Sequence, residues 1–229
     1  DKVDTGTLVR ASPVDRSPFL LDSQELHKSI VLVISEDENM TIGVILNLPG
    51  ARPLEIRIES NGKSRKVLVP LRYGGPYSTK GSEPLLWLHC HSMLKASKVG
   101  APVGSEEGIW KCTANEMMTA VGQGLAKPDD FFVIAGVSIW TKYEQDTVRG
   151  MQGEIRQGRF EIIPEHKTQQ VSDKLAQQTV LAPESLTTNL AIASEAWSLS
   201  VDNNRKKRNG RNGETQPLAG IGENLDEED

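Results

Sequence analysis

Residues 29–49 constrain the fold most, because they join two apolar runs through a short polar segment. The first run, residues 30–34, is almost entirely β-branched and too short for a core helix, so it predicts a strand covered on both faces. The second run, residues 42–48, matches it, and the polar residues 36–39, three of them acidic, supply charge and the turn. Proline cannot donate to a ladder, so Pro49 ends the return strand. We therefore predict a buried β-hairpin at the centre of the fold.

The flanking segments predict further strands of two kinds. Residues 54–59 alternate apolar with charged side chains, which indicates a strand with one wet face, and Asn61-Gly62 signals a turn to a partner strand at residues 66–71. We expect this polar hairpin at the edge of a sheet. More apolar strands are expected at residues 7–11, 84–90, 131–137 and 159–163.

Three segments predict helices. Thr113 and Glu116 form a capping-box pattern that opens the first helix. Residues 142–157 read as a polar helix that carries Met151 and Ile155. Residues 183–201 place Leu186, Leu190, Ala193 and Trp197 at helical spacing, which predicts an amphipathic helix docked on the domain or on a partner.

The composition indicates one domain with appendages. The chain has 229 residues, 37% of them hydrophobic and only 5% aromatic, so part of its length adds little to a core. We expect an α+β domain at residues 6–163, a helical extension at 164–201 and a disordered charged tail at 202–229. The chain begins with Asp1, so we expect a mature form or a fragment.

Charge and hydropathy limit the classes of partner that we expect this chain to bind. The formal net charge of -5 argues against a nucleic-acid partner, although a basic run at residues 205–208 keeps that alternative open. No apolar run approaches the roughly 18 residues that span a bilayer, so we expect no membrane partner. The identity of a protein partner or small ligand and the oligomeric state stay open.

A glycine pair supplies the first candidate binding residues. Gly74-Gly75 precedes Pro76 and permits a positive φ and the close approach of another group, although most such pairs are simple turns. We predict a ligand-binding groove bordered by Asn47, Gly74, Gly75 and Trp140, with Pro76 beside them. The plainer alternative is that they are turn glycines, a hydrogen-bonded Asn and a core Trp.

His89-Cys90-His91 supplies the candidate reactive residues. A His-x-His pair on a strand faces one way and can bind a metal, but no third ligand stands at a telling spacing. The same alternation turns Cys90 away from both histidines, so neither is well placed as its base. Cys90 and Cys112 do not make a disulfide framework for a chain of this size, which favours a reducing compartment. We expect no metal, no cofactor and no catalytic residue.

The order of these motifs resembles the YqgE/AlgH family. The residues that carry the resemblance are Gly6-Thr7-Leu8, Ala11-Ser12-Pro13, residues 43–49, Tyr73-Gly74-Gly75-Pro76, Leu88-His89, Gly136, Trp140 and residues 152–155. The resemblance implies a single α+β domain with a curved, largely antiparallel, partly barrel-like sheet and packed helices. Its members are bacterial and plastid proteins of undefined biochemical role, some of them called transcriptional regulators. The chain departs from the family pattern at Ser35-Glu36, where the family has a Glu-His pair.

Three functions compete. The absence of a nucleophile–base set, a P-loop, a dinucleotide fingerprint and a metal cluster favours a non-enzymatic binding or regulatory module. The alternatives are a hydrolase or thiol-dependent enzyme that uses Cys90, and a nucleic-acid-associated transcriptional regulator that uses the basic tail. The extra hairpin at residues 52–69 and the long tail favour a plastid stromal protein, with a cytoplasmic protein as the alternative.

Overall fold

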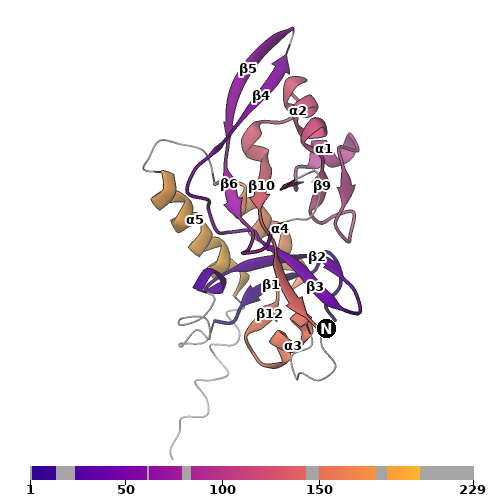
Figure 1. Ribbon diagram of the computed structural model, residues 1–229, viewed down its shortest axis with the longest axis vertical. Coiled ribbons are helices and arrows are strands. Elements are labelled where there is room, and N and C mark those ends of the chain that lie inside the picture. Colours follow the sequence, from indigo (N-terminus) through magenta and orange to yellow (C-terminus); the bar gives the residue numbers. More distant parts are fainter. Residues whose placement is uncertain are drawn as a thin grey trace, which may run out of the picture.

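The computed structural model describes residues 2–13, 24–60, 62–78, 84–142, 150–178 and 185–201. Within these ranges the strands form two five-stranded sheets and a two-stranded ribbon, and helices pack on them (Figure 1). None of these sheets closes on itself, and all strand pairs but one are antiparallel. The predicted α+β class is therefore confirmed.

The first sheet, which we call the hairpin sheet, has the strand order β11-β3-β2-β1-β12. A 3-10 turn, η1 (Gln24–Leu26), leads into β2. The strands of the sheet are β1 (Leu8–Ala11), β2 (Ile30–Glu36), β3 (Met40–Ile45), β11 (Ser138–Thr141) and β12 (Phe160–Ile162). The predicted central hairpin is β2–β3, with a bulge between Val33 and Ser35.

The hairpin is covered on both faces, as its sequence predicts. Because side chains alternate along a strand, Ile30 and Leu32 face one hydrophobic cluster while Val31 and Val33 face another. All four side chains are buried. The cluster under Val31 and Val33 includes Met151 of α3 (Gly150–Arg156), which packs on the outer face of the sheet.

The second sheet has the order β6-β10-β7-β9-β8. Its strands are β6 (Leu71–Tyr73), β7 (Leu85–His89), β8 (Ala101–Pro102), β9 (Trp110–Cys112) and β10 (Phe131–Ala135). The parallel pair is β6–β10. The sequence prediction for residues 66–71 is corrected here, because the return strand ends at Val69 and Leu71 begins β6.

The polar hairpin forms a ribbon of its own, β4 (Leu54–Ser60) and β5 (Lys63–Val69), and is not the edge of a larger sheet. It projects from the body of the molecule beside α2 (Ala114–Gly122) (Figure 1). Its apolar face buries Ile58 and Val69 in a cluster that also holds Met117 of α2. The alternation of its sequence therefore identified the face that packs, and the opposite face is wet.

The helices agree with the sequence prediction in part. The capping box at Thr113 is present, with the Glu116 carboxylate accepting from the Thr113 amide at 2.7 Å. The predicted polar helix is shorter than expected, because Lys142 is extended and α3 begins at Gly150; residues 143–149 lie outside the described ranges. A short helix that the sequence reading missed, α1 (Ser92–Ala96), follows β7.

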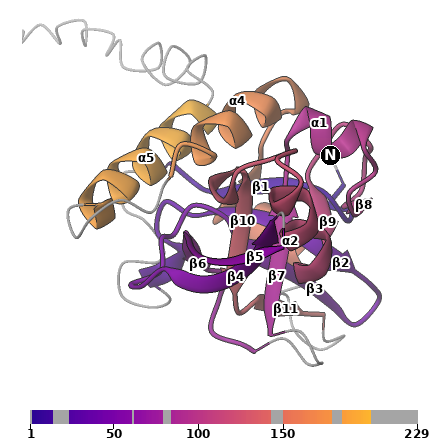
Figure 2. The ribbon, with the colours of Figure 1, turned by 90° about the horizontal axis from the view of Figure 1, so that it is seen from above.

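Two further helices, α4 (Glu165–Leu175) and α5 (Ser185–Ser200), lie along one side of both sheets (Figure 2). The predicted helix at 183–201 is thus present, but Leu190 is half exposed. Its buried positions are Asn189, Ala193, Ala196 and Ser200. Helix α5 packs chiefly against α4, and Ala196 is the residue of its buried face that joins the main core.

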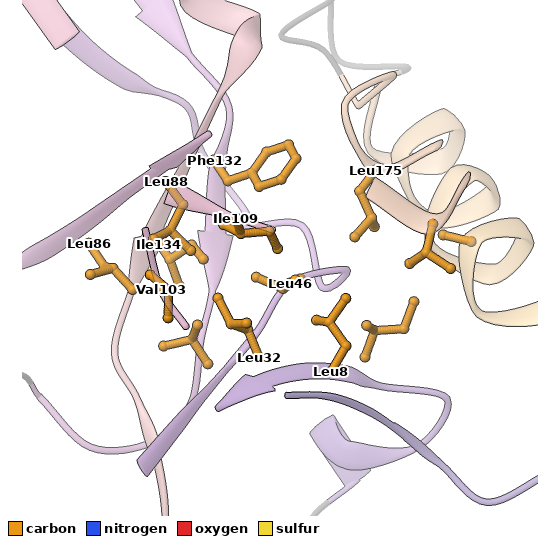
Figure 3. Close-up of a cluster of buried hydrophobic side chains, with 14 of the residues drawn as sticks. Leu8, Leu32, Leu46, Leu86, Leu88, Val103, Ile109, Phe132, Ile134 and Leu175 are labelled. Carbon is orange, nitrogen blue, oxygen red and sulfur yellow. The ribbon is translucent and has the colours of Figure 1, made fainter. Parts of the chain in front are cut away.

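The main core lies between the two sheets and beneath α4 and α5. Figure 3 shows Leu8 and Leu32 of the hairpin sheet facing Leu88, Phe132 and Ile134 of the second sheet, with Leu175 of α4 closing one side. No helix in the described part of the chain is long and apolar enough to cross a membrane. The predicted tail, residues 202–229, lies outside the described ranges.

Candidate functional site

The predicted glycine pair lies where the two sheets meet. Gly74 and Gly75 follow β6, and the amide of Ile45 at the end of β3 donates to the Gly74 carbonyl at 3.0 Å. A Cβ on Gly74 would lie 2.3 Å from the carbonyl oxygen of Gly136, and Gly136 itself has a φ of +80°. The group that approaches this pair closely is therefore the chain's own backbone at Gly136.

Asn47 lies under α5, at the end of the central hairpin. Its side chain is 5% exposed and holds three segments together. The Oδ1 atom accepts from the Ile30 amide at 2.8 Å, and Nδ2 donates to the carbonyls of Lys28 at 2.9 Å and Ala193 at 3.4 Å. Asn47 also lines a small pocket of about 150 Å³, which we call the α5 pocket.

Trp140 and Pro76 lie in different surroundings. Trp140 packs edge-on against Phe160, with ring centroids 5.9 Å apart, in the cluster on the outer face of the hairpin sheet. Pro76 is exposed. The structure thus places Asn47 beneath α5, the glycines at the junction of the sheets and Trp140 in the core, and their sharing one ligand stays a prediction.

Cys90 faces away from His89, as strand alternation predicts, because Cys90 packs against the main core while His89 contacts Phe131 in the cluster on the other face. The shared face predicted for His89 and His91 is not supported, because β7 ends at His89 and His91 precedes α1. His89 is fully buried, with Nε2 2.8 Å from the Val99 carbonyl oxygen, and burial lowers its pKa. Burial raises the pKa of the Cys90 thiol to about 11, the opposite of what a nucleophilic thiolate needs. Cys90 and Cys112 are not joined by a disulfide. No cluster of three or more metal-ligating side chains stands within the described ranges.

Arg72 is the most unusual side chain that sequence reasoning missed. It is 1% exposed, donates from Nη1 to the Leu46 carbonyl at 3.1 Å and from Nη2 to the Leu175 carbonyl at 2.7 Å. Its guanidinium carbon lies 4.1 Å from the centroid of the Phe132 ring. Burial lowers its pKa to about 9, so it remains a cation at neutral pH. Its guanidinium joins β6, the end of the hairpin and the C-terminus of α4, where the helix dipole favours a cation.

A second buried arginine, Arg10, links the hairpin sheet to the end of α5. It lies in β1, where Nη2 donates to Glu161 at 2.6 Å and Nη1 donates to the Ser200 carbonyl at the end of α5. The sequence signal for both arginines is the same: a single cation inside a short apolar strand. That pattern reads equally well as an exposed position, so burial could not be predicted from it.

A pocket of about 570 Å³, which we call the large pocket, opens where β1, the loop between β8 and β9, and the start of α4 meet. Its floor is apolar and consists of Leu8, Leu32, Ile109 and Ile163, all of them buried. Exposed polar side chains stand at its mouth, among them Glu107 and Glu165. Thr168 of α4 completes one wall.

Two glycines close one wall of the large pocket. A Cβ on Gly6 would lie 2.5 Å from the carbonyl oxygen of Val103, and one on Gly104 would lie 2.5 Å from that of Thr5. Both have positive φ, +92° and +85°, so neither position suits an L side chain. The contact brings the N-terminal segment against the second sheet and thereby shapes the pocket.

A comparison with protein-family models agrees with the resemblance seen in the sequence. A family model described as AlgH-like matches residues 15–179, while no curated protein is detectably similar to the chain. A crystal structure of a protein from Corynebacterium diphtheriae is similar at 14% identity and a TM-score of 0.45, covering 88% of this chain and 94% of that one. The solution structure of the AlgH protein from Pseudomonas aeruginosa is similar at 13% identity and a TM-score of 0.45, covering 95% of each chain. Because the family match spans well over half of its residues, the chain belongs to the AlgH-like family.

Proposed function

We propose that this protein is a non-catalytic binding module whose ligand occupies the large pocket. The observation that carries the proposal is the pocket's construction, with an apolar floor of four buried side chains beneath a polar mouth. Its volume of about 570 Å³ falls within the range of small-molecule sites. Such a pocket suits a small organic ligand with an apolar body and a polar end that stays near water.

The lining supports binding over catalysis. Acyl transfer or hydrolysis needs a nucleophile within hydrogen-bond reach of a base that a third group orients. Among the described residues that line the large pocket there is no histidine and no cysteine. The thiol that the sequence offered, Cys90, does not line it, and burial raises its pKa.

The pocket's position suggests how occupancy acts on the rest of the molecule. Its lining combines β1, a loop of the second sheet and the first turns of α4, so a ligand contacts both sheets and the helix that Arg72 holds at its other end. We expect the ligand to stabilise the folded state by mass action, by about 2.7 kcal/mol at a hundred times its dissociation constant. A regulatory role would depend on this stabilisation of the folded state by the bound ligand.

The test is native mass spectrometry of the full chain mixed with pools of small neutral organic fragments. We expect adducts of one fragment per chain, and we expect Thr168→Trp, which places an indole in the pocket wall, to remove them. Thr188→Trp on the exposed side of α5 is the matched control and should keep them. Both variants must first show the parent's circular dichroism. Adducts that survive Thr168→Trp, or no adducts with any pool, would contradict the proposal.

We also propose a plastid stromal location, on the strength of the extra β4–β5 ribbon and the long C-terminal extension. A fluorescent fusion of the gene's whole coding sequence tests it directly. Fluorescence that coincides with chlorophyll supports the proposal, and a diffuse cytoplasmic signal rejects it. The nucleic-acid alternative has less support, because the net charge of the chain is -5.

A further inference from the structure

The projecting ribbon has an open edge along β5 (Lys63–Val69). The other strand, β4, is approached by α2, because a Cβ on Gly122 would lie 2.5 Å from the Glu59 carbonyl oxygen. Outside the ribbon, β5 contacts the 3-10 turn η2 (Pro128–Asp130), but among the described residues its backbone shares hydrogen bonds with β4 alone. No residue of the ribbon lines the large pocket, so what β5 binds is independent of the proposed function.

This edge presents unused main-chain hydrogen-bonding groups. Residues of an antiparallel pair alternate between bonded and non-bonded positions, so every second residue of β5 turns its N–H and C=O away from β4. The residues from Lys63 to Lys66 are all exposed, so a further strand can reach these groups. Addition of an extended peptide to such an edge is a common mode of recognition, in which the main-chain hydrogen bonds supply affinity.

The side chains of β5 divide the strand into a cationic part and an apolar part. Lys63, Arg65 and Lys66 belong to the first part, which contains no acidic residue. Val67 and Leu68 follow, and Leu68 is 48% exposed although it is a large apolar side chain. Cations on an edge strand prevent its pairing with a basic or wholly apolar strand, so this edge favours a partner of opposite charge.

The cations of β5 are only partly neutralised within the ribbon. Lys66 lies directly opposite Arg57 of β4, and like charges in opposite positions destabilise a strand pair. Lys66 forms an ion pair with Glu55 at 2.8 Å, but both side chains are exposed, so the pair contributes little. No ion pair of the described residues involves Lys63 or Arg65. Acidic side chains on an added strand would lie beside these cations.

We propose that the edge of β5 binds an extended segment of a partner protein by strand addition, with acidic side chains opposite Lys63–Lys66 and apolar side chains opposite Val67 and Leu68. In an antiparallel arrangement the apolar residues precede the acidic ones along the partner. Main-chain hydrogen bonds hold the segment, and its carboxylates fix the register. Its apolar residues cover the exposed part of Leu68.

The test is a titration of the ¹⁵N-labelled full chain with the end-blocked peptide Val-Ile-Glu-Glu-Thr-Glu, followed by amide chemical shifts. We expect shifts at residues 63–68. Arg65→Glu should weaken binding at least about ten-fold, because it places a like charge against the carboxylates of the peptide. The matched control Lys111→Glu makes the same charge change at an exposed position of β9, a strand paired on both edges, and should leave the affinity unchanged. Both variants must first show the parent's circular dichroism.

Two N-methylated peptides separate strand addition from attraction between charges alone. One carries methyl groups on its odd-numbered amides and the other on its even-numbered amides, so one of them loses the N–H groups that face β5. We expect that peptide to bind at least about ten-fold more weakly than the other. Equal binding of the two, an unchanged affinity in Arg65→Glu, or no shifts at residues 63–68 with millimolar peptide would overturn the proposal.

Two other occupants of the edge give different results. Oligothymidine that binds at residues 63–68 more tightly than the peptide would assign the ribbon to a nucleic acid and overturn the proposal. Shifts at the same residues that appear on concentrating the chain without peptide would assign the edge to a second copy of the chain, and would overturn it too.

Discussion

The junction of the two sheets and the docking of α5 hold the molecule together by different means. At the junction, backbone lies directly on backbone: a Cβ on Gly136 would be 2.2 Å from the Gly75 carbonyl oxygen. Helix α5 is instead held by side chains that reach across to main-chain carbonyls. Trp197 Nε1 donates to Ala11 at 3.1 Å, and Lys167 Nζ donates to Val201 at 2.7 Å.

The difference predicts how each region responds to substitution. The backbone contact between Gly75 and Gly136 leaves no room for a methyl group, so a single substitution there disturbs the whole junction. The contacts of α5 are several and separate, each worth about 1 kcal/mol, so losing one loosens the helix without detaching it. The first region should therefore fail globally and the second locally.

The largest effect is expected at the junction. Gly136→Ala adds a methyl against the Gly75 carbonyl at a φ of +80° and should lower the free energy of unfolding by at least about 3 kcal/mol. Gly124→Ala is the matched control, because Gly124 has a φ of +75° and no atom within 4 Å of an added Cβ. It should cost only the left-handed strain, about 1–2 kcal/mol. Urea denaturation measures the free energy of unfolding of both variants. Equal losses of stability would mean that the junction has room for a methyl group at Gly136.

The α5 contacts should yield a smaller and more local effect. Asn47→Ala leaves the Ile30 amide and the Lys28 carbonyl unpaired, at a cost of about 2–3 kcal/mol. Hydrogen exchange should speed up in α5 and η1 before it does in β7 or β10. Asn39→Ala, at an exposed turn position, is the control. Uniformly faster exchange across both sheets would remove the distinction between the two regions.

The contact between His89 and Val99 adds a pH-dependent side-chain interaction to the comparison of the two regions. His89 holds Val99 from inside the second sheet, and burial lowers its pKa, so the folded state keeps it neutral while the unfolded chain takes up a proton below about pH 6.5. The contribution of neutral His89 to the free energy of unfolding is complete above that pH. It is lost as the pH falls toward the pKa of the folded state, by at most about 1.4 kcal/mol per pH unit. His89→Gln should flatten this slope when unfolding is compared at pH 7 and pH 5.5, and an unchanged slope would exclude His89 as its source.

The smallest effect is expected at the surface. Thr113→Ala removes the capping box of α2 and should cost about 1 kcal/mol. Thr119→Ala, exposed in the same helix, should be neutral or slightly stabilising because alanine favours helix. A thermal melt of both variants ranks them. If Thr119→Ala costs as much as Thr113→Ala, the loss of stability at Thr113 does not come from the cap.

Local patterns predicted the elements that depend only on local physics. The first β-branched run of the central hairpin, the alternation of β4 and the capping box at Thr113 appear where the sequence placed them, whereas the return strand of the ribbon ends earlier than predicted. Arg72 shows where such reasoning stops, because its burial depends on the Leu175 carbonyl far along the chain. No local pattern records that an arginine in a short strand will meet the end of a helix.

The candidate site was predictable in part for the same reason. The sequence marked Gly74 and Gly75 for close approach, and the approaching group is Gly136. Gly6 and Gly104, which shape the large pocket, carry no signal of their mutual contact, because each is a single glycine in its own loop. The sequence marks Gly6 only through the Gly6-Thr7-Leu8 motif that carries the family resemblance.

The measurement that tests the central claim most directly is an amide chemical-shift map of the full chain with the fragment that gives the strongest adduct in native mass spectrometry. The proposed function predicts that the shifts gather on residues 5–8, 104–109 and 163–169, which surround the large pocket. Shifts confined to other residues, or a fragment that binds without moving any of these three segments, would contradict it.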